Sequence, residues 1–443
     1  MAVCGGRSFG RRVMERGSSG RRVIVPPLGL RSVKDVALHQ AVGATRGGAS
    51  TECAADALAG IEARFEGAYV HVPFCFHKCH YCDFYSFVDS EDRQEAFVER
   101  LERELSALAP WVRAPLSTVF VGGGTPTLLR PPLLARTLRA VRERLGTHPR
   151  AEWTVEANPE TVTEEVAATL AASGVTRVSL GAQSFDPRHL KTLERWHDPA
   201  SVGRAVALLR AAGIGRISLD LIFGIPGQSV EDWERDLDAA LALGPDHLSC
   251  YGLTYEPNTA MTARLRRGDF EPCEDASEAR MLETACARLA AAGFRRYEVS
   301  NWARVRDGAP RAEECAHNML YWLDRDWLAA GPSASGHAGN VRWKNVPRLG
   351  DWLASAGTSP VVDVERATPD MQAGERLMMG LRLVDGLPEA EIDAILALGE
   401  RGAARARAIA RAVDDGRMER VDGQLRFTER GMMTANATLA DLV

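Results

Sequence analysis

Three closely spaced cysteines are the side chains of this chain best suited to bind a metal. Cys75, Cys79 and Cys82 follow a C-x3-C-x2-C spacing in a segment that also contains His77 and His80. Three thiolates on one loop can bind three irons of a cubane cluster and leave the fourth iron open. The alternatives are a zinc ion completed by one of the histidines, or three unlinked core thiols. Because closed zinc sites more often combine two C-x2-C pairs, and the sequence has no second pair, the spacing favours an iron–sulfur cluster.

Polar residues at the ends of expected strands form a second group of candidates. Glu156, Gln183 and Asp220 each lie at or just beyond the carboxyl end of a short apolar run, and Arg195 follows Gln183 by twelve residues. Polar side chains at such positions do not suit a hydrophobic core, but they are well placed to contact a ligand. The turn at 122–127, Gly-Gly-Gly-Thr-Pro-Thr, has bare Cα positions that let backbone groups approach a ligand. Each polar residue alone could be an ordinary rim hydrogen-bonding group, whereas the set predicts a binding site.

The elements that must position these residues alternate between strand and helix. Short apolar runs predict strands at 69–72, 118–121, 153–155, 177–180, 216–223 and 247–253. Apolar residues recur every three or four positions between them and predict helices. The rhythm indicates an α/β fold with a parallel sheet, either an open doubly wound sheet or a partial barrel, whose site lies at the carboxyl ends of the strands. The cysteine loop follows the first strand directly.

The chain divides into four expected parts. Residues 1–67 are rich in Gly, Ala, Ser and Arg and are predicted to be a disordered extension, since they offer little apolar surface to bury. Residues 68–258 form the strand and helix core, and 259–365, dense in aromatics and His, a cap subdomain. Residues 366–443 read as a winged-helix-like α+β module. An Arg-rich, acid-poor start would also suit a mitochondrial transit peptide, but a dispensable extension is favoured.

Composition narrows the class of protein. The 443 residues hold 54 Lys and Arg against 59 Asp and Glu, a net charge of −5, so no basic field predicts a nucleic-acid partner. No apolar run reaches the roughly 18 residues of a membrane-spanning helix, although peripheral membrane contact stays open. Nine cysteines, an odd number, argue against a secreted disulfide framework. We expect a cytoplasmic protein.

The cysteine loop and the glycine turn together resemble the radical S-adenosylmethionine (SAM) superfamily. That resemblance implies a partial (β/α)6 barrel, a [4Fe-4S] cluster on Cys75, Cys79 and Cys82, and SAM bound to the open iron through its amino and carboxylate groups. It assigns Arg195 to the SAM carboxylate. The other implied SAM-binding residues are Tyr69, Tyr81, Gly123, Gly124, Thr125, Glu156, Gln183, Asp220 and Thr254. Of these, Glu156, Gln183 and Asp220 are expected to hold the amine and ribose hydroxyls, Tyr69 to lie beside the methionyl group, and Tyr81 and Thr254 near the adenine.

Within the superfamily the chain resembles the subfamily that contains oxygen-independent coproporphyrinogen III oxidase and the HemW heme chaperones. The oxidase has a fourth cysteine two residues after the triad, where this chain has Phe84. The segment 315–322 contains H-N-x-x-Y-W, which is similar to the signature of the chaperone branch. The resemblance extends from about Tyr69 to the C-terminus and favours the chaperones.

The H-N-x-x-Y-W segment predicts a heme site. Heme presents an iron that binds imidazole, a large apolar face and two propionates. The predicted heme residues are His317, Asn318, Tyr321 and Trp322, with Arg311 or Arg342 as propionate partners and His337 and Cys315 as further iron ligands. The alternative is that the histidine ties a loop while the aromatic residues fill a small core.

Two functions of different kinds follow. The first is a heme chaperone that binds heme and hands it to a hemoprotein acceptor of unknown identity. The second is a radical enzyme that decarboxylates the propionates of coproporphyrinogen III, which Phe84 disfavours. A radical reaction on another substrate is a third reading, and whether SAM is cleaved in a chaperone stays open. The cluster and SAM are expected in every case.

Overall fold

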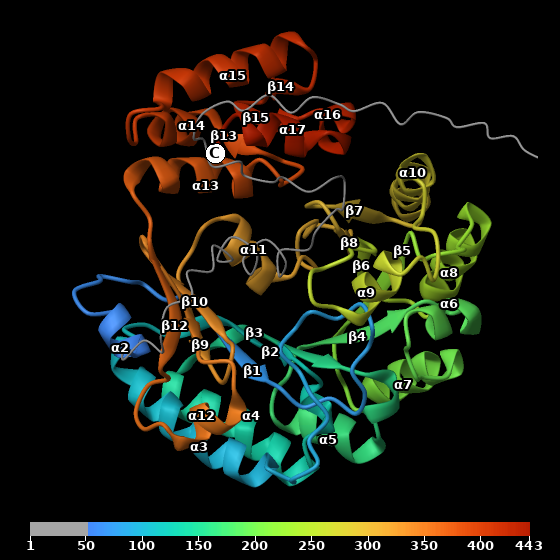
Figure 1. Cartoon of the computed structure of the whole chain (residues 1–443), viewed down its shortest axis with the longest axis vertical. Helices are drawn as coiled ribbons and strands as arrows, with labels where there is room; N and C mark the ends of the chain where they lie inside the picture. The colour runs from blue at the N-terminus through green and yellow to red at the C-terminus, as the bar shows by residue number, and fades with distance from the viewer. Residues whose placement is uncertain (1–51) are drawn as a thin grey trace, which may run out of the picture.

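Six parallel strands form the centre of the sheet that carries the cysteine loop. The computed structural model describes residues 52–443, so the prediction of disorder for residues 1–51 lies outside the described residues. The strands are β1 (Gly67–Val72), β2 (Leu116–Gly123), β3 (Thr147–Ala157), β4 (Arg177–Gln183), β5 (Arg216–Phe223) and β6 (His247–Gly252). They pair in sequence order and are parallel throughout. The predicted α/β fold is confirmed, and the curved sheet matches the partial-barrel alternative (Figure 1).

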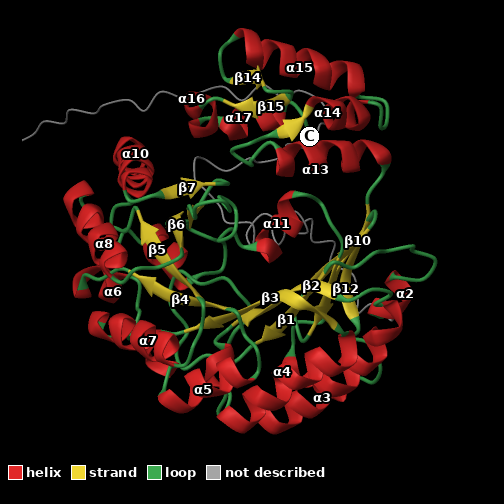
Figure 2. Ribbon diagram, turned by 180° about the vertical axis from the view of Figure 1, so that it is seen from behind, coloured by secondary structure: helices red, strands yellow, loops and turns green. Residues whose placement is uncertain are grey.

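Helices cover the convex outer face of this sheet (Figure 2). They are α3 (Gln94–Leu108), α4 (Pro131–Leu145), α5 (Glu164–Ala172), α7 (Pro199–Ala211) and α8 (Val230–Ala242), with the short α6 (Pro187–Thr192) before α7. The apolar stripe of α3, which includes Phe97, Leu101 and Leu105, is fully buried against the strands. Helix α8 begins at a reciprocal cap, in which Asp232 N donates to Ser229 Oγ at 3.1 Å and Ser229 N donates to Asp232 Oδ2 at 3.0 Å. The apolar periodicity of the sequence thus predicted which side of helix α3 is buried.

Residues 259–365 extend the sheet at both edges. They were predicted to form a separate cap subdomain, whereas their strands belong to the same sheet as β1–β6. Beside β1 lie β9 (Trp327–Ala330), β10 (Ser335–Ala338), β11 (Val341–Asn345) and β12 (Val361–Arg366); beside β6 lie β8 (Asn301–Arg304) and β7 (Phe294–Arg296). The helices of this part are α9 (Ala260–Arg266), α10 (Asp275–Ala291), α11 (Ala316–Trp322) and α12 (Leu349–Ala354). Added strands pair the backbone groups that β1 and β6 would otherwise expose at an edge. Of the aromatic residues in this part, Trp302 and Trp343 are buried in the main core, and Trp322 is buried in the core of the C-terminal module.

The predicted boundary at residue 67 is also wrong. Helix α2 (Ala54–Ala57) precedes β1, and Ala54, Leu58 and Phe65 are buried in the main core. Cys53 forms an antiparallel bridge with Pro360, next to β12. The composition of residues 1–67, taken as a whole, concealed a short apolar stretch near its end. That stretch gains its stability from contacts with residues about 300 positions away, which no local pattern reveals.

The C-terminal residues form a small α+β module with its own core, as predicted. It contains α13 (Pro369–Gly380), β13 (Leu387–Pro388), α14 (Glu389–Leu396), α15 (Gly402–Asp414), β14 (Met418–Val421), β15 (Gln424–Phe427), α16 (Glu429–Met433) and α17 (Ala435–Ala440). The three strands pair in the order β13-β15-β14. Val299 and Trp322 of the preceding part pack into this second core, which ties the module to the barrel. Among the described helices, none is long and apolar enough to cross a membrane.

Candidate cofactor site

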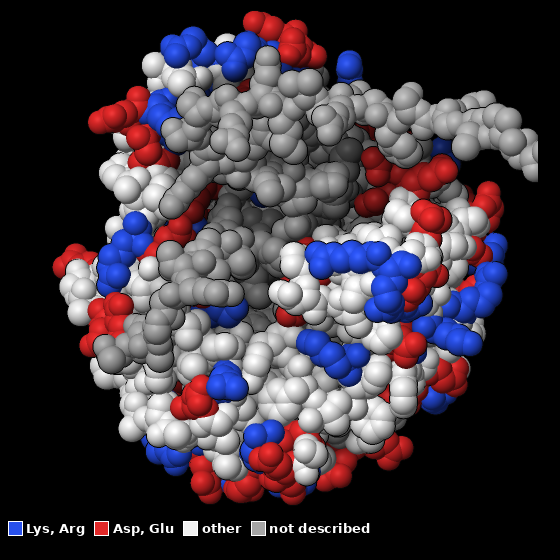
Figure 3. All heavy atoms as spheres, viewed as in Figure 1, with Lys and Arg blue, Asp and Glu red and all other residues white. Residues whose placement is uncertain are grey.

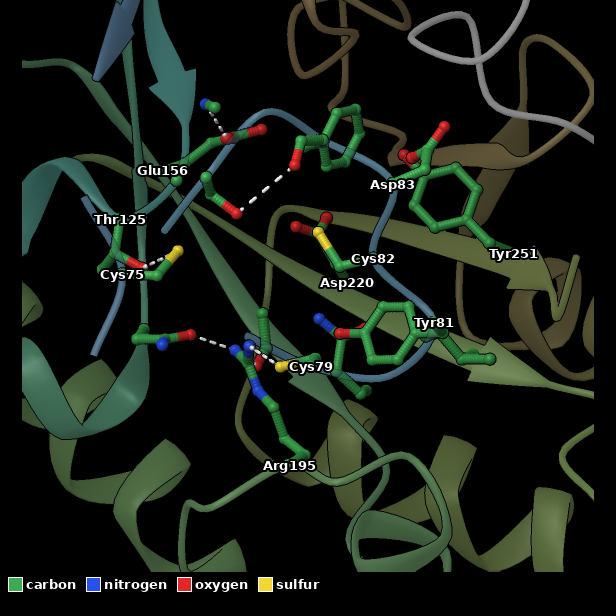
Figure 4. Close-up of a pocket in the computed structure, with 18 of the residues that line it drawn as sticks. Cys75, Cys79, Tyr81, Cys82, Asp83, Thr125, Glu156, Arg195, Asp220 and Tyr251 are labelled. Carbon is green, nitrogen blue, oxygen red and sulfur yellow. Dashed lines mark hydrogen bonds between the residues drawn. The ribbon is translucent and has the colours of Figure 1, made fainter. Parts of the chain in front are cut away.

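The three cysteine sulfurs point into one cavity at the carboxyl ends of the parallel strands (Figure 4). The cavity has a volume of about 210 Å³. Backbone hydrogen bonds hold the loop in place: Cys75 N donates to Phe87 O at 2.9 Å, and Cys82 N donates to Cys79 O at 3.2 Å. Thus the loop that the sequence placed after the first strand brings its thiols together at the predicted edge of the sheet.

Each thiol has a hydrogen-bonding group or a cation beside it. Thr125 Oγ1 lies 3.7 Å from Cys75 Sγ, Arg195 Nη1 donates to Cys79 Sγ at 3.6 Å, and Lys78 Nζ lies 4.0 Å from Cys82 Sγ. Burial raises the pKa of Cys82 to about 11. This thiol therefore ionises when bound positive charge, such as cluster iron, offsets its desolvation. The set of donors fits three thiolates on a cluster.

The zinc alternative requires a histidine in the same cavity. His77 does line the cavity, and its ring stacks on Trp196 with the centroids 4.5 Å apart. His80 is not among the lining residues, and its Nδ1 lies 3.4 Å from Arg264 Nη1. A closed zinc site would use its full coordination shell on protein ligands, whereas this cavity continues past the thiols along a polar wall. The cavity therefore fits a cluster with a further polar ligand better than a closed zinc ion.

The glycine turn packs tightly between the cysteine loop and β3. A Cβ atom on Gly124 would lie 2.6 Å from Phe74 O, and Gly123 has a φ of +108°. Gly123 N donates to Glu156 Oε2 at 2.9 Å, which holds this carboxylate at the cavity wall. The glycines are thus required by the close approach of two backbone segments, as well as by any approach to a ligand.

The polar wall is held by neighbours on adjacent strands. Arg195 is half-buried, and its Nη2 donates to Gly181 O at 2.8 Å and to Asn158 Oδ1. Both carboxylate oxygens of Asp220 lie 3.0 Å from Ser179 Oγ. Gln183 has a φ of +63° where the register between β4 and β5 shifts. A non-glycine residue in this region of backbone space marks a site where neighbouring structure imposes the conformation.

Almost all of the predicted cluster and SAM residues meet in this cavity. Its lining includes Cys75, Cys79, Cys82, Tyr81, Gly123, Gly124, Thr125, Glu156, Gln183, Arg195, Asp220 and Thr254. Tyr69 does not line it: this residue lies deeper along β1, its hydroxyl is 3.1 Å from His71 Nδ1, and its ring stacks on Phe120. Because the side chains of a strand alternate and the cavity lies at the strand end, a residue near the middle of β1 does not reach it.

Sequence reasoning missed several residues of the same wall. Asp83, Asn158, Ser179, Tyr251 and Glu256 also line the cavity. Asp83 follows Cys82 directly, so its position in the loop was a usable signal. Ser179 was not recognisable, because only the register of β4 beside β5 brings its hydroxyl to Asp220.

A second, smaller cavity lies next to the first. Its volume is about 60 Å³, and it is lined by Tyr69, His71, Phe84, Tyr85, Phe120, His317, Asn318, Tyr321, Trp327, Ser333 and Ser335. Phe84 lines both cavities and so forms part of the wall between them. His317 is buried with Nδ1 2.8 Å from Thr118 Oγ1, and its ring stacks on Phe120 with the centroids 5.4 Å apart.

The predicted heme residues do not all lie together. His317, Asn318 and Tyr321 line the second cavity, whereas Trp322 is buried in the core of the C-terminal module. Consecutive residues on a helix point about 100° apart, so Tyr321 and Trp322 face different neighbours.

The predicted propionate partners and additional iron ligands are engaged elsewhere. Arg342 makes two hydrogen bonds to Glu375, at 2.7 and 2.6 Å, and Arg311 pairs with Asp385. His337 Nδ1 lies 2.9 Å from Arg325 O, and Cys315 Sγ lies 3.5 Å from Glu152 Oε1. None of these four residues lines either cavity.

The fold and the three-thiol cavity define a radical SAM protein. Residues 69–240 match the Radical SAM superfamily, and residues 367–434 match the HemN C-terminal domain. Membership of this superfamily implies a [4Fe-4S] cluster and SAM. The chain belongs to the HemW family: it is 40% identical over 383 residues to the heme chaperone HemW of Mycobacterium tuberculosis, covering 85% of this chain and 94% of that protein. It is 36% identical over 321 residues to the heme chaperone HemW of Lactococcus lactis, covering 72% and 82% respectively.

A solved structure has the same fold over most of its length. The coproporphyrinogen III oxidase HemN of Escherichia coli, described as a radical SAM enzyme, superposes with a TM-score of 0.74 at 23% identity. The superposition covers 87% of this chain and 92% of that one. At this identity the likeness concerns the fold, and the sequence relationship to HemW is the stronger one.

Proposed function

We propose that this protein is a heme chaperone, which binds heme and transfers it to an acceptor hemoprotein, on a scaffold that retains its cluster and SAM. The observation that carries the proposal is the 40% identity to a heme chaperone across 94% of that relative. The second cavity, which is lined by residues of the H-N-x-x-Y-W segment and separated from the cofactor cavity by Phe84, supports it. We place the protein in the cytoplasm, because all eight cysteines among the described residues are free.

Cys75, Cys79 and Cys82 would hold the cluster. A [4Fe-4S] cluster supplies one-electron chemistry and an open iron for a further ligand. The cations beside Cys79 and Cys82 would stabilise the thiolates.

The polar wall would bind SAM through charge and hydrogen bonding. Arg195 would pair its guanidinium with the SAM carboxylate, for which a planar fork is suited. Glu156, fixed by Gly123 N, would accept hydrogen bonds from the SAM ammonium. Asp220, fixed by Ser179, presents two oxygens that suit the paired hydroxyls of a ribose. Gln183, Tyr81 and Thr254 line the same cavity and would contact the ribose and adenine of SAM.

Heme would bind where His317, Asn318 and Tyr321 line the second cavity. A volume of about 60 Å³ is far below the several hundred Å³ of usual ligand pockets, so this region must open to admit a porphyrin. The His317 imidazole must also exchange its Tyr321 partner for iron, because Nε2 lies 2.9 Å from the Tyr321 hydroxyl. Trp322 would act from the C-terminal core as a support for the helix that carries these residues.

A second candidate function is oxidative decarboxylation of coproporphyrinogen III. The shared fold with HemN of Escherichia coli, at a TM-score of 0.74, favours it. Phe84 argues against it, because the resemblance to that enzyme implies a fourth cysteine at this position.

The deciding experiment is anaerobic reconstitution followed by heme titration and a coproporphyrinogen turnover assay. We expect stoichiometric heme binding without decarboxylation. His317→Ala should weaken binding by about tenfold or more, which corresponds to about 1.4 kcal/mol per factor of ten. His148→Ala, at an exposed position on β3, should bind like the unaltered protein. Decarboxylation of coproporphyrinogen III at catalytic rates would overturn the chaperone proposal and support the oxidase.

A further inference from the structure

The ammonium group of Lys78 contacts three residues of the segment that follows it. Its Nζ donates to Ser86 Oγ at 3.0 Å and to the carbonyl oxygen of Phe84, and it lies 4.0 Å from Cys82 Sγ. An ammonium group has three N–H donors and no acceptor. The three contacts, to residues four, six and eight positions further along the chain, therefore match its three donors and fold this segment back onto the cysteine loop.

The segment that Lys78 holds separates the two cavities. Phe84 lines both cavities, Ser86 lines the cofactor cavity, and Tyr85 lines the second cavity. We call these three residues the partition. His71 Nε2, in the second cavity, donates to Tyr85 O at 2.7 Å. Two successive carbonyl groups of the partition are thus bound by different cations or donors, Phe84 O by Lys78 beside the thiols and Tyr85 O by His71.

Lys78 also brings a positive charge next to one of the cluster thiols. Its side chain is half-buried, so water screens its charge less than it screens a fully exposed charge. On the face that Figure 3 shows, Lys and Arg side chains lie interspersed with Asp and Glu side chains. Surface charges of both signs largely cancel, and salt screens those more than about 10 Å away. The charge of Lys78 therefore acts on Cys82 in a way that the surface charge does not reproduce.

We propose that Lys78 is a positioning residue that holds the partition between the two cavities and raises the reduction potential of the cluster. This inference rests on the proposed function, because it requires a cluster on Cys82. One-electron reduction of the cluster from the 2+ to the 1+ state adds one negative charge beside the ammonium, which stabilises the reduced state more than the oxidised state. Net charge and hydrogen bonds to the sulfurs are among the factors that set such potentials. The same ammonium keeps the Phe84 ring in the wall between the cavities.

Three substitutions separate these two roles. Lys78→Met keeps a long side chain and removes both the charge and the donors. Lys78→Arg keeps the charge, but a planar guanidinium does not reproduce the three contacts of a compact ammonium. Ser86→Ala removes one partner of the ammonium and leaves the charge in place. Arg407→Met is the control, because it removes an equal charge from an exposed position on α15.

Hydrogen exchange of the cluster-free chain tests the partition. Backbone amides exchange faster where local structure opens more often. We expect the peptide that contains residues 83–87 to exchange about tenfold faster in Lys78→Met than in the unaltered protein. Ser86→Ala should cause a smaller increase. Arg407→Met should leave the exchange of this peptide unchanged.

A redox titration of the reconstituted protein tests the charge. At a fixed potential, the ratio of reduced to oxidised cluster should be about tenfold lower in Lys78→Met, which corresponds to about 59 mV for a one-electron couple. Lys78→Arg and Ser86→Ala should stay within about threefold of the unaltered protein, because both keep the charge. Arg407→Met should have the potential of the unaltered protein. If Lys78→Met takes up no cluster, Lys78→Gln, which is also neutral but keeps a donor, is titrated in its place.

The two measurements also separate this inference from the proposed function. If the unaltered protein forms no cluster, the proposed function fails, while hydrogen exchange still tests whether Lys78 holds the partition. If the cluster forms and the neutral variant keeps the potential of the unaltered protein, the electrostatic role is wrong. If exchange of residues 83–87 is the same in Lys78→Met and the unaltered protein, the positioning role is wrong. A potential that falls equally in Lys78→Arg and Lys78→Met would overturn the electrostatic role too, because it would assign the change to a displaced loop.

Discussion

The hydroxyl oxygen of Tyr321 lies 2.9 Å from Nε2 of His317, so the two side chains form a hydrogen bond. The other ring nitrogen, Nδ1, lies 2.8 Å from Thr118 Oγ1, so both nitrogens are engaged. An imidazole in this state is a satisfied buried group, and it becomes an iron ligand only by giving up one partner. Breaking the hydrogen bond between His317 and Tyr321 therefore adds to the free-energy cost of heme binding through the His317 imidazole.

Removing the Tyr321 hydroxyl should release His317 for iron. We expect Tyr321→Phe to lower the stability of the protein by about 1 kcal/mol, the typical value of a buried hydrogen bond. The same change should tighten heme binding, because Nε2 no longer has to leave a partner while the flat ring is kept. Heme absorbance titration and urea unfolding measure the two effects. If Tyr321→Phe weakens heme binding as much as His317→Ala does, the tyrosine hydroxyl itself contacts heme.

Removing one cluster thiol should abolish the cluster. We expect Cys82→Ser to prevent stable binding of iron and sulfide during anaerobic reconstitution, since two thiolates and a hydroxyl hold a cubane poorly. Iron and sulfide analysis, together with the visible absorbance, measures the result. Cys273→Ser is the control, because this thiol lies outside the cavity. Full iron content in Cys82→Ser would contradict the ligand assignment.

Replacing Arg195 by lysine should weaken SAM binding. A lysine keeps the charge but not the planar fork, so at least one charge-assisted hydrogen bond is lost. That loss corresponds to roughly a tenfold or larger fall in affinity. Calorimetric titration of SAM into the reconstituted protein measures this affinity. Arg204→Lys, on the exposed side of α7, is the matched control. Equal SAM affinity in the Arg195 and Arg204 variants would show that Arg195 does not contact SAM.

Adding a methyl group to the glycine turn should destabilise the site. In Gly124→Ala the new Cβ would meet Phe74 O at 2.6 Å, which forces the backbone apart. We expect a loss of about 1–3 kcal/mol in unfolding free energy. Gly203→Ala on α7 meets its nearest atom at 3.5 Å and should be neutral or slightly stabilising. Thermal and urea unfolding of both variants measure the difference in stability. If Gly124→Ala is as stable as the original protein, the backbone of the turn can move to accommodate the methyl group.

The carboxyl of Glu278, on α10, should make stability depend on pH. Burial raises the pKa of this group to about 7, above its ordinary value of 4.5. The folded state therefore holds a proton that the unfolded state releases, and the stability of the protein should fall as pH rises from about 4.5 to 7. Glu278→Gln removes this contribution. We expect the variant to match the original protein at pH 5 and to exceed its stability at pH 8, measured by urea unfolding. Parallel pH profiles of the two proteins would exclude the carboxyl as the cause.

Local pattern was enough to predict the main elements, and most of the predicted cofactor residues line the cofactor cavity. Strand β5 has the bounds that the sequence predicted, because an uninterrupted apolar run marks a strand that is buried on both faces. The cysteines and polar strand-end residues were found in the same way, since parallel strands bring their carboxyl ends to a single edge. For these residues, position along the chain implies position in space.

Other features depended on contacts between distant segments. The pairing of β9 with β1, the burial of residues near Phe65, and the separation of Trp322 from Tyr321 follow from packing partners far away in the chain. The exposure of Trp196 and its stacking on His77 are equally invisible to a local pattern. The sequence by itself determined the chemistry available to this protein, because residue type and spacing set which ligands a loop can offer. Only the tertiary structure decided which side chains share a cavity, because burial and hydrogen bonding are properties of the neighbours that folding supplies.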